Sequence, residues 1–226
     1  MLSHIPGVLK PDQVAECRKL IDAANWVDGR ATAGFMAERV KNNQEVAQGH
    51  PAARQAGELI LSALAANPLF IAVALPLRIC PPFFNRYQGG ETYGTHNDSA
   101  LINVPGAPAP IRGDLSATLF LTPPESYDGG ELIVEDTYGV HRVKLPPGDL
   151  ILYPAASLHR VAPVTRGARV SSFFWIQSMV RDDDKRALLL AIDRARSELN
   201  RALPDHPAVV QVLNVYHNLL RMWAET

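Results

Sequence analysis

The spacing of hydrophobic residues predicts helices near both ends of the chain. Residues 11–26 carry one apolar face, and residues 51–75 repeat the pattern with a break near Pro68. Residues 182–203 and 207–224 form a second helical region, which begins with three aspartates. The apolar face of the first helix comprises Val14, Cys17, Leu20, Ile21 and Ala24.

Between these regions the pattern changes to short strands. From Leu77 to Ser178, short apolar runs alternate with turns that contain glycine and proline. Many short strands with little helix between them are typical of two packed antiparallel sheets. We therefore expect a mainly β protein with flanking α-helices, in which the core is a double-stranded β-helix, or jelly roll. The strands are expected within 77–87, 115–121, 131–135, 140–144 and 149–153.

The same changes of pattern divide the chain into three parts. Residues 1–76 are expected to form an N-terminal helical region packed on the core, with a polar segment at 28–50. Residues 77–178 are expected to form the jelly roll, and residues 179–226 a C-terminal helical region.

Composition narrows the class of protein. The 226 residues are 47% hydrophobic and 20% charged, as in an ordinary globular protein with a substantial core. A formal net charge of −1 with no basic block argues against binding to nucleic acid or to an anionic membrane. Cys17 and Cys80 supply neither a disulfide framework nor zinc spacing. We see no signal peptide, and the most apolar stretch, 69–77, is too short to span a bilayer, so we expect a cytoplasmic protein.

Candidate metal ligands lie at two places in the strand region. His96 and Asp98 are two residues apart, so in an extended segment their side chains point to the same side. His159 lies at the start of a later strand-like run. Two imidazoles and one carboxylate are the ligand set of a non-haem Fe(II) site with open coordination positions. Arg169, ten residues further on, can pair with the far carboxylate of an acidic co-substrate, which indicates an Fe(II) oxygenase that consumes 2-oxoglutarate.

The His-x-Asp spacing alone is a weak signal. With 7 histidines in the chain, about 0.4 matches are expected by chance, and a surface pair in a polar loop is the alternative interpretation. That alternative loses weight because a second histidine and an arginine follow on strand-like segments.

The runs that begin at His159 and Arg169 predict a β-hairpin, with Gly167 in its turn. If Pro163 opposes Arg169, then His159 opposes Phe173 and these side chains share one face. A shift of one residue would turn the arginine away from the metal. We expect the first register.

Other polar and aromatic residues allow two interpretations. The Tyr87 hydroxyl either bonds the co-substrate carboxylate or is a satisfied group in the core, and the two are equally weighted. Core packing is favoured for Tyr93 and Trp175, and a surface or edge position for His141. Asp182–Asp184 are expected to be a solvated helix N-terminus rather than a metal site.

Several longer motifs are shared with a known family. They are Phe84–Asp98, Asp114–Leu121, Tyr127–Leu132, Pro147–Leu150, Tyr153–Pro154 with His159, Trp175–Asp184 and Leu213–Arg221. In these motifs, over nearly its whole length, the chain resembles the bacterial PKHD-type hydroxylases. That family belongs to the prolyl/lysyl-hydroxylase-like branch of the Fe(II)/2-oxoglutarate dioxygenases.

The resemblance implies roles for the residues already singled out. His96, Asp98 and His159 would bind Fe(II), and Arg169 would bind 2-oxoglutarate with assistance from Tyr87. It also implies the use of dioxygen and L-ascorbate and an association with iron uptake. It does not identify the primary substrate.

Three other functions are weighed against this one. A nucleic-acid demethylase similar to the AlkB-type repair enzymes would carry a second arginine six residues after the first, where this chain has Trp175. A cupin-like metalloprotein that works without 2-oxoglutarate would not need Arg169. An iron or 2-oxoglutarate sensor that acts by binding a partner fits the same ligands, and catalytic turnover would distinguish it from an enzyme.

The last helix is too apolar for a solvated tail. Its hydrophobic residues fall at three- and four-residue spacing, which produces a stripe that must be covered. It either packs on residues 11–75 of its own chain or forms a two-fold interface between identical chains. Our hypothesis is a homodimer or larger homo-oligomer. The stripe comprises Val209, Val212, Leu213, Tyr216, Leu219, Leu220 and Trp223.

Overall fold

The fold is given by a computed structural model, which describes residues 1–32, 37–47, 49–104, 107–137 and 139–225. Its helices agree with those expected from the sequence, although the first ends four residues earlier than predicted. They are α1 (Pro11–Asp22), α2 (Pro51–Ala65), α3 (Pro68–Ala74), α4 (Asp183–Ala202) and α5 (Pro207–Trp223), with short 3-10 turns η1 (Gly29–Thr32), η2 (Ala37–Val40) and η3 (Pro124–Ser126).

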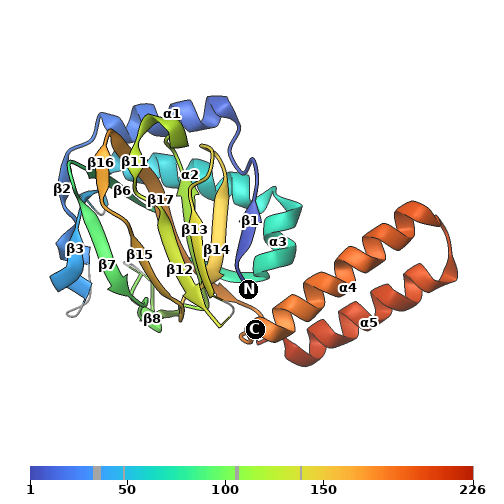
Figure 1. Ribbon diagram of the computed structural model, residues 1–226. Coiled ribbons are helices and arrows are strands. Elements are labelled where there is room, and N and C mark those ends of the chain that lie inside the picture. Colours follow the sequence, from blue (N-terminus) through green and yellow to red (C-terminus); the bar gives the residue numbers. More distant parts are fainter. Residues whose placement is uncertain (33–36, 48, 105–106, 138, 226) are drawn as a thin grey trace.

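Two antiparallel sheets face each other in the described part of the chain (Figure 1). The larger, eight-stranded sheet has the order β1 (Ser3–Ile5), β14 (Leu150–Pro154), β10 (Leu115–Phe120), β17 (Ala168–Ser178), β6 (Phe83–Gln88), β4 (Gln44–Val46), β2 (Trp26–Asp28), and β5 (Pro76–Ile79) also pairs with β17. The smaller has the order β13 (Gly139–Val143), β12 (Leu132–Asp136), β15 (Leu158–Val161), β7 (Thr92–His96), β3 (Lys41–Asn42). Two further pairs join β8 (Leu101–Ile102) with β9 (Ile111–Arg112) and β11 (Asp128–Gly129) with β16 (Val164–Arg166). The expected jelly roll with flanking helices is confirmed.

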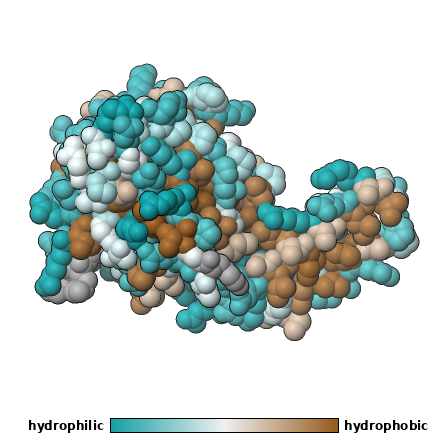
Figure 2. Space-filling model, viewed as in Figure 1, coloured by the Kyte–Doolittle hydropathy of each residue, from teal (hydrophilic) through white to brown (hydrophobic). Residues whose placement is uncertain are grey.

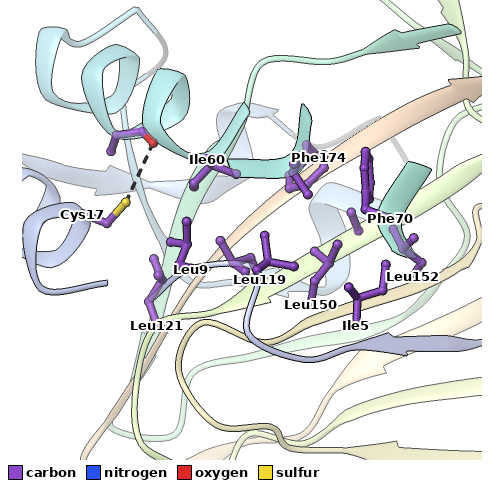
Figure 3. Close-up of a cluster of buried hydrophobic side chains, with 14 of the residues drawn as sticks. Ile5, Leu9, Cys17, Ile60, Phe70, Leu119, Leu121, Leu150, Leu152 and Phe174 are labelled. Carbon is purple, nitrogen blue, oxygen red and sulfur yellow. Dashed lines mark hydrogen bonds between the residues drawn. The ribbon is translucent and has the colours of Figure 1, made fainter. Parts of the chain in front are cut away.

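The hydrophobic core has two layers, one on each side of the larger sheet. Outer-face residues of β10 and β14, among them Leu119 and Leu150, pack with Ile60 of α2 and Phe70 of α3, and all four are fully buried (Figure 3). A second cluster lies between the two sheets. In the outer layer, the thiol of Cys17 donates to the carbonyl oxygen of Ala56, 3.8 Å away.

Both cysteines are buried, Cys17 in this outer layer and Cys80 in a separate small cluster with Ile102 and Ile111. Burial raises the pKa of both Cys17 and Cys80 to about 12, so both thiols stay protonated at neutral pH. Both are free cysteines, as their number and spacing predicted.

The polar segment at 28–50, for which no strands were expected, helps to complete both sheets. Its strand β4 pairs with β6 of the larger sheet, whereas β3 pairs with β7 of the smaller one. Residues 41–46 therefore cross from one sheet to the other along one side of the sandwich. Strands of two or three residues are too short to show a periodic pattern, which explains why the sequence did not reveal them.

The predicted hairpin between the runs at His159 and Arg169 is wrong. Strand β15 pairs with β12 and β7 in the smaller sheet, whereas β17 pairs with β10, β6 and β5 in the larger one. The chain crosses between the sheets through β16, and Gly167 has the expected positive φ, of 69°. Alternation shows which face of a strand is apolar, but two runs close in sequence can either pair or cross to the facing sheet.

The C-terminal helices form a hairpin that projects from the sandwich (Figure 1). Helix α4 packs against α3 and α5, and Leu75, Val180 and Leu189 form a small buried cluster at its base. Among the described residues of α5, none is buried. Hydrophobic surface extends along this hairpin (Figure 2). No single helix in the described ranges has the length and apolarity to cross a bilayer; α2 and α3 pass that test only as a pair, bent by 86°.

Candidate metal centre and co-substrate pocket

The three predicted metal ligands lie together between the two sheets. His96 ends β7 and is paired in register with His159 on β15, so the strand pairing places the imidazole rings with centroids 4.2 Å apart. Asp98 follows two residues after His96, and its carboxylate oxygens lie 3.9 Å from Nε2 of His96 and 3.8 Å from Nε2 of His159. Their ligating atoms all lie within 4.8 Å of one another, close enough to share one ion.

Hydrogen bonds to neighbouring groups fix the orientation of all three side chains. Nδ1 of His96 lies 2.8 Å from the carbonyl oxygen of Gly94, and Nδ1 of His159 lies 3.0 Å from that of Ser157. A carbonyl only accepts, so each Nδ1 carries the proton and each Nε2 lone pair is left available for a metal ion. The hydroxyl of Ser116 donates to Asp98 and fixes its carboxylate.

Electrostatics also favour metal binding. Burial, and then the neighbouring His159, lower the pKa of His96 to about 4. The imidazole is therefore neutral at pH 7, the form that binds a metal. Tyr93 stacks on the His96 ring with centroids 3.6 Å apart, and Tyr153 packs edge-on to His159 at 5.0 Å.

Arg169 lies on the larger sheet and is a buried cation. Only 1% of its surface is exposed, and within the described ranges it forms no ion pair with an acidic side chain. One guanidinium nitrogen donates to Ser171 at 2.7 Å, while Nε has no hydrogen-bond partner among the described residues. A buried charge without a counter-ion is costly, so the guanidinium has the character of a binding site for an anion.

Two tyrosines surround this guanidinium. Tyr87 is paired in register with Arg169 across β6 and β17, and its ring centroid lies 5.5 Å from the guanidinium carbon. Burial raises the pKa of Tyr87 well above its usual value, so its hydroxyl keeps its proton and can donate. The buried hydroxyl of Tyr127 also lies near Arg169: burial raises the pKa of Tyr127, and the positive charge of Arg169 opposes that rise.

One cavity of about 640 Å³ joins the three ligands to Arg169 and Tyr87. Successive inward positions on β17 change from Arg169 and Ser171 to Phe173 and Trp175, so one end of the cavity is cationic and polar and the other aromatic. Although the predicted hairpin is wrong, the expected proximity of histidine and arginine holds, because each faces inward from its own sheet.

Comparisons with known proteins agree with this geometry. Residues 82–177 match the 2OG-Fe(II) oxygenase superfamily, and residues 183–225 match the PKHD-type hydroxylase C-terminal domain. A PKHD-type hydroxylase of Burkholderia lata is 57% identical over 227 residues, and one of Bordetella pertussis is 54% identical over 225, each covering 100% of both chains. This chain belongs to the PKHD-type hydroxylases. It is therefore a 2-oxoglutarate-dependent dioxygenase by family.

Solved structures share the fold of this PKHD-type hydroxylase at lower identity. A Pseudomonas putida prolyl-4-hydroxylase superposes with a TM-score of 0.52 and 24% identity, over 78% of this chain and 92% of that one. A prolyl hydroxylase of Trichoplax adhaerens gives a TM-score of 0.57 with 16% identity, over 83% and 86%. These likenesses concern the jelly-roll fold.

The structure also places residues that sequence reasoning missed or interpreted differently. Tyr93 and Trp175, expected in the core, line the cavity instead. Ser116 and Tyr127 were not singled out, although both lie in motifs shared with the PKHD-type hydroxylases. His141 stands on β13 and pairs with the carboxylate of Asp136 at 3.0 Å, away from the metal ligands as expected.

Proposed function

We propose that His96, Asp98 and His159 bind Fe(II) in this PKHD-type hydroxylase, and that Arg169 and Tyr87 bind 2-oxoglutarate. The observation that carries the proposal is one cavity with a two-histidine, one-carboxylate cluster on one wall and a buried cation on the facing wall. The donor set suits Fe(II), and the three ligands leave positions open for other molecules.

The side chains have separable tasks in this scheme. Bound Fe(II) and 2-oxoglutarate supply the redox chemistry, in which 2-oxoglutarate and dioxygen give succinate and carbon dioxide and a C–H bond is hydroxylated. Gly94, Ser157 and Ser116 hold the three ligands in place. Arg169 pairs with the far carboxylate of the co-substrate, and Tyr87 donates to the same group.

Several finer assignments belong to the same proposal. The primary substrate is unidentified, and we propose a link with iron uptake and the use of L-ascorbate on the family resemblance. We propose a cytoplasmic location on the two buried free thiols. The division into residues 1–76, 77–178 and 179–226 stays a prediction.

We also propose that the protein is a homodimer or larger homo-oligomer that associates through the C-terminal hairpin. On α5, the exposed Val215 and Met222 extend the apolar sector beyond the part that faces α4, and Leu188 is exposed on α4. The segment 179–226 carries seven acidic and seven basic residues, so its net charge does not oppose contact with an identical copy.

The function is tested by anaerobic reconstitution with Fe(II) and 2-oxoglutarate. After oxygen is admitted, a metabolite and proteome extract is screened for products heavier by one oxygen atom.

Replacing His96, Asp98 or His159 by alanine should greatly weaken Fe(II) binding while the fold survives. Iron binding equal to the parent in all three variants contradicts the ligand assignment, and iron binding without 2-oxoglutarate turnover favours the sensor.

A further inference from the structure

A short hairpin that belongs to neither sheet forms part of the cavity wall. It comprises residues 101–104 and 107–112, and among the described strands its members β8 and β9 pair only with each other. Leu101, Ile102 and Asn103 of this β8–β9 hairpin line the cavity. The shape of the cavity therefore depends on what holds the β8–β9 hairpin in place.

Apolar contacts hold the β8–β9 hairpin at the aromatic end of the cavity. Ile102 and Ile111, which are paired in register, are buried in one cluster with Cys80. Phe83 and Trp175 of the cavity wall pack against this cluster. Hydrophobic contacts are not directional, so they do not by themselves fix the position of the hairpin relative to the rest of the cavity.

Arg112, at the end of β9, supplies the directional contacts. Its Nε and one terminal nitrogen donate to the two carboxylate oxygens of Asp114, at 2.7 and 3.1 Å. The same terminal nitrogen donates to the carbonyl oxygen of Ser178, where β17 ends, at 3.3 Å. The other terminal nitrogen donates to the carboxylate of Glu225 at 2.7 Å. One guanidinium therefore joins the β8–β9 hairpin both to the sandwich and to the C-terminal segment.

The sandwich side of this junction leads to one of the proposed metal ligands. The side chain of Asp114 is only 5% exposed, and it also accepts from the backbone N–H of Ser178 at 2.9 Å. The carbonyl oxygen of Asp114 accepts from the N–H of Ala155 at 3.1 Å, and that of Ala155 accepts from the N–H of Asp98 at 3.3 Å. The junction is thus linked through two backbone hydrogen bonds to the segment that carries Asp98.

The other side of the junction reaches the C-terminal hairpin. After α5, the backbone N–H of Glu225 donates to the carbonyl oxygen of Met179 at 2.7 Å, which returns the chain to the sandwich (Figure 1). The pair of Arg112 with Glu225 therefore joins the segments 82–177 and 183–225, which match separate family models. Because the Glu225 side chain is 55% exposed, this contact is weak enough to be removed without unfolding the protein.

We propose that Arg112 is a positioning residue of the cavity: it holds the β8–β9 hairpin against the aromatic wall, and the C-terminal hairpin contributes to that hold through Glu225. The inference rests on the proposed function, because it takes the cavity to be the place where co-substrate and substrate bind. Among the described residues that line the cavity, none lies beyond Trp175. The C-terminal hairpin would thus act on the cavity without contributing a side chain to it. Loss of the junction should let the β8–β9 hairpin move away more often and quicken the exchange of molecules with the cavity.

The two cysteines report on this movement. Cys80 is fully buried in the cluster with Ile102 and Ile111, whereas Cys17 is fully buried in the outer core layer. The full chain is treated with iodoacetamide at mildly alkaline pH, and labelling is quantified at each cysteine by mass spectrometry. Faster labelling of Cys80 alone indicates movement of the β8–β9 hairpin, and faster labelling of both indicates general unfolding.

Two variants and a matched control are compared with the parent. Glu225→Gln removes only the contact with the C-terminal segment, and Arg112→Lys keeps the charge but loses the fork. The control Glu198→Gln makes the same charge change at an exposed position on α4. Each protein is also loaded with Zn(II) in place of Fe(II) and with radiolabelled 2-oxoglutarate, and release of the label is followed during a chase with unlabelled 2-oxoglutarate. Urea unfolding is measured alongside, because a contact that only stabilises the fold would shift the unfolding midpoint and leave the release rate unchanged.

Labelling of Cys80 should quicken about threefold in Glu225→Gln and about tenfold or more in Arg112→Lys, with Cys17 unchanged. Release of 2-oxoglutarate should quicken in the same order, and the control should match the parent in both measurements. Unchanged labelling of Cys80, or an equal rise at both cysteines, overturns the inference that Arg112 positions the β8–β9 hairpin. Faster labelling of Cys80 with unchanged release overturns its role in the cavity. Failure of the parent to retain 2-oxoglutarate contradicts the proposed function, and the labelling of Cys80 still decides whether Arg112 holds the hairpin.

Discussion

At the scale of one residue, both the charge and the shape of the Arg169 side chain suit it to bind a carboxylate. Its guanidinium is buried, donates to Ser171 and faces Tyr87, so a carboxylate that enters the cavity meets a fixed planar fork. The sequence singled out this residue, His96, Asp98, His159 and Tyr87, because few residue types perform such chemistry, and the structure places all of them around one cavity. The sequence did not single out Ser116, since nothing in a buried strand indicates which polar side chain will contact Asp98.

Replacing Arg169 by lysine keeps the charge but loses the fork. We expect the 2-oxoglutarate concentration required for half-saturation to rise well over tenfold, more than ~1.4 kcal/mol, with little change in Fe(II) affinity. The matched control is Arg166→Lys, whose guanidinium forms an exposed pair with Asp128. Titration of 2-oxoglutarate followed by calorimetry measures both variants, and an unaltered curve for Arg169→Lys would remove this residue from the site.

Gly130 lies beside the same arginine, so that a side chain added at this position would crowd it. It has a φ of +68°, and an added Cβ would lie 2.8 Å from Val164, 3.0 Å from Tyr127 and 3.2 Å from Cδ of Arg169. Gly130→Ala should therefore weaken 2-oxoglutarate binding and cost ~1–3 kcal/mol of stability from crowding, beyond the backbone penalty. Gly89→Ala isolates that penalty, because Gly89 has a φ of +57° and an added Cβ there would meet no neighbour within 4 Å. Equal effects of the two changes on unfolding and binding would show that crowding is absent.

At the scale of helices and strands, what could be predicted depended on the length of each element and on the residues that begin or end it. The break between α2 and α3 was visible because Asn67 and Pro68 both favour a helix start, and the Asn67 side chain accepts from the backbone N–H of Phe70 at 2.9 Å. The placement of β15 and β17 in different sheets was not visible, because crossing to the facing sheet is decided by contacts distant in sequence. Burial of His159 and Arg169 on facing walls follows from that crossing.

The cap at Asn67 provides a measurable test of this local reasoning. Asn67→Ala should lower the free energy of unfolding by ~1 kcal/mol, because the N–H of Phe70 loses its partner. Asn200→Ala, at an exposed position within α4, should change stability by much less. Urea unfolding of the two variants compares them directly, and equal stability would mean that the cap contributes nothing.

At the scale of the whole molecule, the catalytic sandwich and the C-terminal hairpin differ in how fully they bury their apolar residues. The sandwich buries its apolar residues between its sheets and beneath its helices, whereas α5 leaves apolar residues in solvent. The apolar stripe of α5 was clear from the sequence, and the structure half-buries it against α4 and the small cluster at the base of the hairpin. The proposed self-association would cover the apolar residues that remain exposed on the hairpin, and an identical chain is the simplest partner.

The double change Val215→Asp/Met222→Asp should convert the proposed oligomer to a monomer without altering 2-oxoglutarate binding. These residues are 49% and 74% exposed in the single chain, so charges there disrupt an interface more than the fold. Gln211→Glu adds a negative charge at an exposed polar position on the same helix and should leave the mass unchanged. Light scattering at micromolar concentration decides the matter, and a monomeric parent would contradict self-association while leaving the catalytic assignment intact.

The most direct test of the central claim is an anaerobic titration of the parent and of Asp98→Ala with Fe(II) and 2-oxoglutarate. The signal is the visible charge-transfer absorption of ferrous ion chelated by a 2-oxo acid. If His96, Asp98 and His159 hold the metal in the cavity that Arg169 closes, the parent develops this band with saturation at one iron per chain. Asp98→Ala should not develop it under the same conditions. An undiminished band in Asp98→Ala, or no band in the parent, would contradict the account.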